Sequence, residues 1–450
     1  MIPHKIPILF LLFLLILLIS FPSMAKESET AKQSQTNSQI SSDSLKSGAP
    51  ITALIKKLEE RISELEKINK KQKEQDELNK LLEEAKNLTT IQKKKEIGVG
   101  KKFSSGVRQQ SGLNPNISVG GDFYTALSTA KDNFITKPGA FSYGNNRFQL
   151  RELELSFESP LDPFTRGKTH LSLTENSICI EEAYMEWLNL PANLNLKIGL
   201  FNAEFGNLNR YHDHALPQFD RPRVLVDMFT NCTIGGFGVG GNFLLKPLLF
   251  ADASTLDLTV LRGGNGQSFT DEGKYNLLYS GVFKNYYDIT QNTYLEWRLS
   301  GVSGKNDPTE KYWSHVGNFA FTVKWVPINR SKYRAINWQT EMLYNYRETP
   351  TGTIKSKGFY TSLQNKLNMR YWTSVRVGYS ELPFDTSQHE WDFTGCVDFW
   401  QSEFVFLRLQ YQYNKRDISS LPDLSGPFPS DQTLILQVNW AMGPHKHEAY

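Results

Sequence analysis

Hydrophobic and polar residues alternate along most of the chain after Leu113, and a period of two is typical of β-strands. Over 153–158, leucine and phenylalanine occupy the odd positions, while glutamate and serine occupy the even ones. The same alternation predicts about sixteen strands, near 117–128, 147–158, 169–174, 180–188, 194–201, 235–245, 255–262, 274–285, 292–302, 314–326, 335–347, 357–368, 371–380, 389–400, 404–413 and 432–440. Each strand therefore has one apolar face and one face of charges and amides.

The predicted connections distinguish a membrane barrel from a soluble sandwich, which has the same alternation. Connections after odd-numbered strands are mostly long, such as 129–146, and those after even-numbered strands are mostly short. The exceptions are two longer even links, near 159–168 and 246–254, and one short odd link near 175–179. Long external and short periplasmic connections are typical of a transmembrane barrel. Such a barrel must be closed, because lipid offers no hydrogen-bond partners to the backbone groups of an open strand edge. We therefore predict an all-β transmembrane barrel of about 16 antiparallel strands over 116–450, wide enough for an aqueous channel.

The part of the chain before residue 116 follows other patterns. Residues 1–25 have a basic start, an apolar run and a small-x-small site, which together predict a secretory signal peptide. Residues 26–50 are rich in Ser, Gln, Thr and Lys, a composition typical of a disordered linker. Residues 93–115 form a second linker, rich in lysine and containing glycine.

Residues 51–92 carry an apolar stripe at alternating four- and three-residue steps. The stripe consists of Ile51, Ile55, Leu58, Ile62 and Leu65, and the polar Asn69 continues it. This spacing predicts an α-helical coiled coil in the periplasm. Two interpretations remain: an oligomerising helix, or a single exposed helix or spacer across the periplasm.

Charge and cysteine content narrow the function classes. The formal net charge of +3 gives no global field for nucleic acid, so no nucleic-acid partner is predicted. Three scattered cysteines lack CxxC spacing, and Cys179 and Cys232 are either bonded to each other or two unlinked thiols. No GxSxG, HExxH or phosphate-loop motif occurs. We therefore predict neither an enzyme nor a bound cofactor.

The barrel region resembles the phosphate-selective porin O and P family and its broad relatives. The residues that carry the resemblance are FQLRELELSFESPLDP (148–163), EEAYMEWLNLPANLNLKIGLFNAEFGNLNRYHDH (181–214) and GGFGVGGNFLL (235–245). The resemblance implies a channel in the bacterial outer membrane, in contact with its lipid and commonly a trimer. Selectivity for phosphate in that family depends on runs of lumen arginines and loop lysines. Here such residues are interspersed with glutamate and aspartate, so phosphate is not implied.

The longest gap in the alternation, 202–234, falls at the third external connection, which in general porins folds inward and narrows the barrel. By that analogy this stretch is the predicted constriction. Its charged candidates are Arg210, His212, Asp213, His214, Asp220, Arg221, Arg223 and Asp227. Facing charges of opposite sign in a narrow passage would select solutes by size and charge.

The polar faces of the strands supply candidates for the lining of the lumen. By alternation these are Lys197, Arg298, Lys324, Glu341, Arg376 and Arg408, together with Glu152 and Glu154. Both signs of charge occur, so no dominant anion field is predicted, and most of these side chains are expected to be solvated lumen charges.

The spacing His212-x-His214 also suggests a metal site, because alternate positions of an extended segment place both imidazoles on one side. Asp213 and Asp220 could assist. The competing interpretation is a pair of solvated or hydrogen-bonded loop histidines, which we favour because no further ligand spacing is present. His445 and His447 repeat the spacing near the end of the chain.

The prediction from these patterns is a porin for passive diffusion of small hydrophilic solutes or ions. One alternative is a barrel anchor whose coiled coil tethers the outer membrane to the cell wall. Another is a substrate-specific channel for a phosphate-like anion or a metal complex.

Overall fold

The computed structural model describes Arg61 and residues 115–130, 133–137, 141–144, 146–229, 233–264, 267–274, 276–419 and 429–443, with only the backbone described over 133–144. The predicted signal peptide, both linkers and the coiled coil lie outside these residues, apart from Arg61 and the last position of the second linker. Cys179 and Cys396 are free thiols, and Cys232 lies outside the described residues. Among the described residues, no helix combines the length and apolar character needed to span a membrane.

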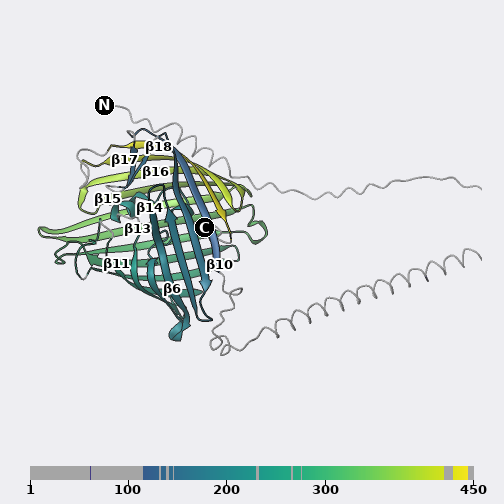
Figure 1. The fold of residues 1–450 in the computed structure, drawn as a ribbon, viewed down its shortest axis with the longest axis horizontal. Coiled ribbons are helices and arrows are strands. Elements are labelled where there is room, and N and C mark those ends of the chain that lie inside the picture. Colours follow the sequence, from purple (N-terminus) through teal and green to yellow (C-terminus); the bar gives the residue numbers. More distant parts are fainter. Residues whose placement is uncertain are drawn as a thin grey trace, which may run out of the picture. The chain divides into compact units, whose positions relative to one another are not determined.

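Sixteen antiparallel strands form a closed barrel in which each strand pairs with its neighbours in sequence and β1 pairs with the last strand (Figure 1). The barrel strands are β1 (Asn116–Ser128), β4 (Phe148–Pro160), β5 (Thr165–Leu173), β6 (Ile178–Leu190), β7 (Leu194–Asn202), β8 (Gly235–Leu245), β9 (Ala253–Arg262), β10 (Leu277–Thr290), β11 (Thr293–Lys305), β12 (Trp313–Trp325), β13 (Ala335–Thr349), β14 (Gly352–Lys366), β15 (Tyr371–Leu382), β16 (Asp385–Ser402), β17 (Val405–Asp417) and β18 (Asp431–Met442). Each overlaps one predicted strand, so the predicted barrel is confirmed.

Two further strands, β2 (Asn133–Lys137) and β3 (Phe141–Gly144), form a hairpin in the connection between β1 and β4. Neither strand of this hairpin is among those predicted from the sequence. Strands of five and four residues are too short for an alternation of period two to stand out from a loop.

The barrel is apolar on its outer face and polar on its inner face. In β13 the side chains of Trp338, Met342 and Tyr344 are 44%, 55% and 49% exposed, while those of Glu341 and Asn345, on the other face of the strand, are fully buried. The same inversion occurs in the other strands, where buried positions are mostly Ser, Thr, Asn, Gln and charged residues. A band of large apolar side chains on the outside is unfavourable in water but is the arrangement that acyl chains stabilise.

One tight contact between neighbouring strands depends on a glycine. Gly199 of β7 has φ +140°, and it pairs with Tyr184 of β6. A Cβ at this position would lie 2.3 Å from the carbonyl oxygen of Ala183. Only glycine fits both the backbone angle and the space.

We expect Gly199→Ala to lower the free energy of unfolding by about 1–3 kcal/mol, because the strained backbone and the clash must both be accommodated. The measurement is guanidinium unfolding in lipid vesicles, followed by tryptophan fluorescence. Gly301→Ala in β11 is the matched control, since a Cβ there meets nothing within 4 Å. Equal effects of the two substitutions would contradict the assignment.

Candidate functional site

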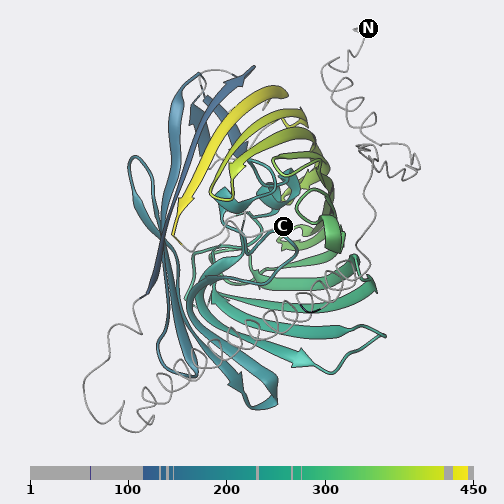
Figure 2. The same ribbon diagram turned by 90° about the vertical axis from the view of Figure 1, so that its right-hand side faces the viewer.

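The connection between β7 and β8, residues 203–234, folds into the barrel, and we refer to it as the inward segment. It contains a 3-10 turn, η3 (Asp213–Ala215), and a short helix, α4 (Arg223–Met228). Figure 2 shows these teal elements inside the ring of strands. Asn209 joins the two ends of the segment, because its amide nitrogen donates to the carbonyls of Ala203 (2.7 Å) and Ile234 (2.9 Å).

The apolar side chains of the inward segment pack against the barrel wall. Phe205, Leu216 and Met228 are almost completely buried and belong to one cluster with inward residues of the strands, such as Leu261 and Leu343. The segment therefore lies against the wall over much of its length rather than hanging freely in the lumen.

Polar contacts attach the first part of the segment to β10, β11 and β13. The carboxylate of Glu204 lies 3.2 Å from Lys284 Nζ. The Gly206 carbonyl accepts a hydrogen bond from Arg298 Nη1 (2.7 Å), and the Asn207 N–H donates to Glu341 (2.7 Å). Opposing cations hold the pKa of Glu204 at about 2 despite the effect of burial.

The middle of the segment is attached to β15 and β17. Arg408 Nη1 donates to the Leu216 carbonyl (3.0 Å). Arg376 donates to the carbonyl of Asp220 (2.8 Å) and to its carboxylate (3.0 Å). The side-chain amides of Gln410 and Gln412 complete the set around Asp220, each at 2.8 Å. Every oxygen of this buried aspartate is therefore hydrogen-bonded.

Helix α4 contacts β16 through charge. Arg223 Nε lies 2.5 Å from Glu390, which also accepts from Arg416 at 2.9 Å. Asp227 is 3.4 Å from Arg223 but lies fully buried beside the same glutamate. Burial and then the negative charge of Glu390 raise the pKa of Asp227 well above its usual range. Asp227 is therefore harder to ionise in the folded protein than in the unfolded chain.

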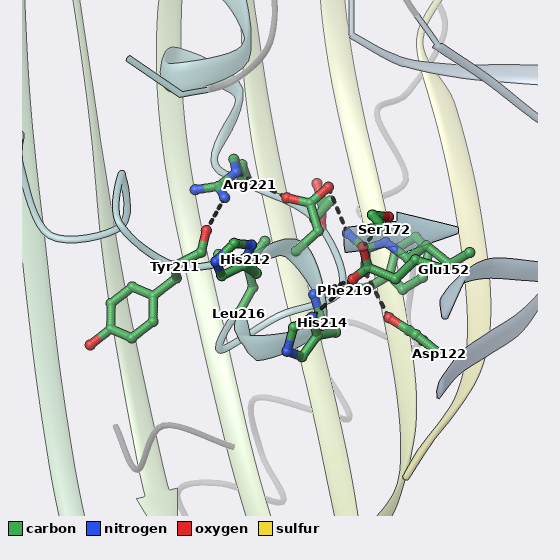
Figure 3. Close-up of polar contacts among 12 residues, drawn as sticks. Asp122, Glu152, Ser172, Tyr211, His212, His214, Leu216, Phe219 and Arg221 are labelled. Carbon is green, nitrogen blue, oxygen red and sulfur yellow. Dashed lines mark hydrogen bonds and ion pairs between the residues drawn. The ribbon is translucent and has the colours of Figure 1, made fainter. Parts of the chain in front are cut away.

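The turn η3 and the residue before it, His212, place two histidines against acidic residues of β4 and β6 (Figure 3). His214 Nδ1 lies 3.0 Å from Glu152, and His212 contacts Glu181 and, at 3.4 Å, Glu182. Burial alone would lower the pKa of His214, but the bond to Glu152 and the charge of Glu154 raise it to about 9. Burial would also lower the pKa of His212, but the bonds to Glu181 and Glu182 outweigh it. The pKa of His212 is therefore raised well above its usual value.

Arg221 organises the segment internally rather than facing a solute. Its guanidinium donates to the carbonyls of Leu208 (2.7 Å) and Tyr211 and contacts Asp213 at 3.1 Å (Figure 3). The Asp213 side chain remains 48% exposed, and its second oxygen lies 3.3 Å from Arg151.

The predicted constriction residues thus fall into two groups. His214, Asp220, Arg221, Arg223 and Asp227 are buried and bonded, and His212 is nearly so. Arg210 is exposed and Asp213 is half-exposed. Most of the charges that stand out in the sequence therefore fasten the segment instead of facing open space.

The predicted lumen residues divide in the same way. Glu152, Glu154, Arg298, Glu341, Arg376 and Arg408 are buried against or near the inward segment. Lys197 and Lys324 are half-buried. Lys197 Nζ lies over the rings of Tyr184 (4.5 Å) and Phe201 (5.2 Å), and no ion pair to it occurs among the described residues.

Beside the inward segment, strands β5 to β10 line a cavity of about 180 Å³. Its charged residues are Arg166, Glu186, Lys197, Glu204, Asp257 and Lys284. Of these, the sequence analysis identified only Lys197. Alternation marks the wall residues as inward, but nothing local indicates which part of the wall stays uncovered.

The raised pKa of Asp227 predicts an unusual pH dependence. When folding raises the pKa of a carboxyl group, the free energy of unfolding of the protein falls as pH rises from the unfolded-state pKa toward the folded-state pKa. We expect Asp227→Asn to match the wild type near pH 4. At higher pH the variant should be the more stable, by up to about 1.4 kcal/mol for each pH unit.

The control is Glu390→Gln, which leaves Arg223 with less charge compensation and should cost about 3–5 kcal/mol near pH 7. Guanidinium unfolding at a series of pH values measures both. If the free energy of unfolding of Asp227→Asn instead falls relative to that of the wild type as pH rises, the raised pKa of Asp227 is contradicted.

No protein-family model matches the chain. An uncharacterized protein of Aquifex aeolicus (strain VF5) is 26% identical to the chain over 315 residues. The match covers 60% of this chain and 64% of that relative, so the chain spans less than two thirds of the relative's length. Among solved structures, the chain is similar to the anion-selective porin from Comamonas acidovorans (TM-score 0.50, 8% identity, 73% of this chain and 100% of that one). It is also similar to OprB of Pseudomonas putida (TM-score 0.51, 9% identity, 74% and 95%). These likenesses show that the chain has the closed-barrel fold of outer-membrane porins.

Proposed function

We propose that the protein is an outer-membrane porin through which small hydrophilic solutes or ions diffuse passively along their gradient. The observation that carries the proposal is the charged cavity between the inward segment and β5 to β10. It lies within a barrel of sixteen strands whose outer face is apolar. An apolar outer face suits lipid, and a charged inner space suits water and polar solutes.

The inward segment is the proposed constriction. Glu204 comes from the segment, and the other charged residues of the cavity come from the wall. Lys284 lies 3.2 Å from Glu204 and 3.0 Å from Asp257, so opposite charges share the passage. Such an arrangement produces a local transverse field that acts on polar solutes.

The charges of the cavity balance, which argues for weak ion selectivity. Arg166, Lys197 and Lys284 give three positive charges, and Glu186, Glu204 and Asp257 give three negative charges. Phosphate selectivity is not part of the proposal, because the buried Arg223, Arg376 and Arg408 are each paired with an acid. A trimer, which the family resemblance implies, remains the expected assembly.

The first test is conductance in planar lipid bilayers. We expect the wild type to form open channels with little preference between cations and anions. Lys197→Glu should shift the permeability ratio several-fold toward cations, because it replaces the one cavity cation that forms no ion pair among the described residues. Lys332→Glu makes the same charge change at an exposed turn and should leave the ratio unchanged. If the wild-type protein gives no conductance in the bilayer, the proposed function is wrong.

A second test concerns the constriction. Arg376→Ala with Arg408→Ala removes the guanidinium donors to Asp220 and Leu216 and leaves those of Gln410 and Gln412. The middle of the segment should then detach, and the single-channel conductance should rise and fluctuate. Arg334→Ala, an exposed arginine outside the barrel interior, is the control. Circular dichroism checks that the barrel has formed. Unchanged conductance in a folded double variant would show that the segment does not limit the passage.

A further inference from the structure

A group of imidazoles and carboxylates lies between the inward segment and strands β4 to β6. Its members are Glu152, Glu154, His170, Glu181, Glu182, His212 and His214. The rings of His170 and His212 are stacked with centroids 4.6 Å apart, and those of His212 and His214 lie 6.0 Å apart. Figure 3 shows His212 and His214 on the segment, with Glu152 beside them.

Three members of the group have the spacing of a metal site. Glu154, His170 and His212 each offer one ligand atom, and these atoms all lie within 4.8 Å of one another. Tetrahedral coordination with bonds of about 2.1 Å separates ligand atoms by about 3.4 Å, so modest side-chain movement would suffice. The side chains of His170 and Glu154 are 0% and 2% exposed, and that of His212 is 11% exposed.

The donor set also fits. Two imidazoles and one carboxylate are ligands that Zn²⁺ and related divalent transition metals accept. A metal-bound histidine usually donates its other ring N–H to a carboxylate. Glu181 contacts Nδ1 of His212 and Glu182 contacts Nε2, so an ion on one nitrogen would displace the carboxylate there and the other glutamate would serve in that role.

The charge balance calls for added positive charge. Four carboxylates face three imidazoles in this group, and a cation of charge two would neutralise part of their negative charge.

We propose that Glu154, His170 and His212 bind one divalent transition-metal ion, with Zn²⁺ the best match, and that this ion fastens the inward segment to the barrel wall. Glu154 belongs to β4 and His170 to β5, while His212 belongs to the segment. The ion would therefore join parts of the chain that are far apart in sequence.

The experiment uses the full-length protein in detergent, freed of metal with a chelator. Isothermal titration with Zn²⁺ should give one ion per chain for the wild type, and Co²⁺ should give the intense visible bands of tetrahedral coordination. His170→Gln and His212→Gln should each weaken binding at least about tenfold, since even an outer partner of a ligand contributes that much. His170 lies on a barrel strand, so its variant remains informative if substitution of His212 disturbs the segment.

Two controls test the location. His315→Gln changes an exposed histidine near Trp313, far from the group in the barrel order. The double variant His445→Gln with His447→Gln removes the other His-x-His pair. Both should bind like the wild type. Loss of binding in the double variant, or unchanged binding in both His170→Gln and His212→Gln, would overturn the site.

The binding measurement does not depend on conduction. A protein that binds the ion but forms no open channel would refute the proposed function and leave the site intact. A protein that forms an open channel but binds no metal ion would refute the site and leave the proposed function intact.

Discussion

The width of the barrel is the constraint on which the rest of the structure depends. Sixteen strands enclose a space that their own inward side chains cannot fill. The inward segment supplies the missing packing. Phe205, Leu216 and Met228 bring apolar surface into an interior that the strands line with polar groups, and they meet the few apolar inward residues, such as Leu261 and Leu343. The strands thus form a hydrogen-bonded frame, and the segment forms much of what is packed inside it.

Buried charges determine where the segment lies. Apolar packing alone is not directional, and burying an ion is costly unless its partners are well placed. Here the partners are well placed. Arg376 donates to Asp392, Thr394 and both the carbonyl and the carboxylate of Asp220. Such bonds are made only when the segment sits in one position, so they fix its register on the wall.

The sequence predicts the frame well and the site in part. Alternation is a local property, so sixteen strands could be recognised one at a time from positions such as Leu153 and Trp338. Partners across the lumen are not local. Asp220 and Arg376 are 156 positions apart, and no spacing rule connects them. His170 was missed for the same reason, because a single histidine on a strand gives no hint that His212 will stack on it.

The position of the cavity follows from how the segment is fastened. Its histidines face the acidic residues of β4 and β6, while Asp220 and the carbonyls of Gly206 and Leu216 face arginines of β11, β15 and β17. Along β7 to β10 the only ion pair to the segment within the described residues is that of Glu204 with Lys284. The segment is therefore drawn toward the arcs where complementary charge is dense. The charged cavity lies along β5 to β10, where Lys197 Nζ lies over aromatic rings. The contacts that position the inward segment and the place of the cavity beside it are thus two results of one distribution of charge.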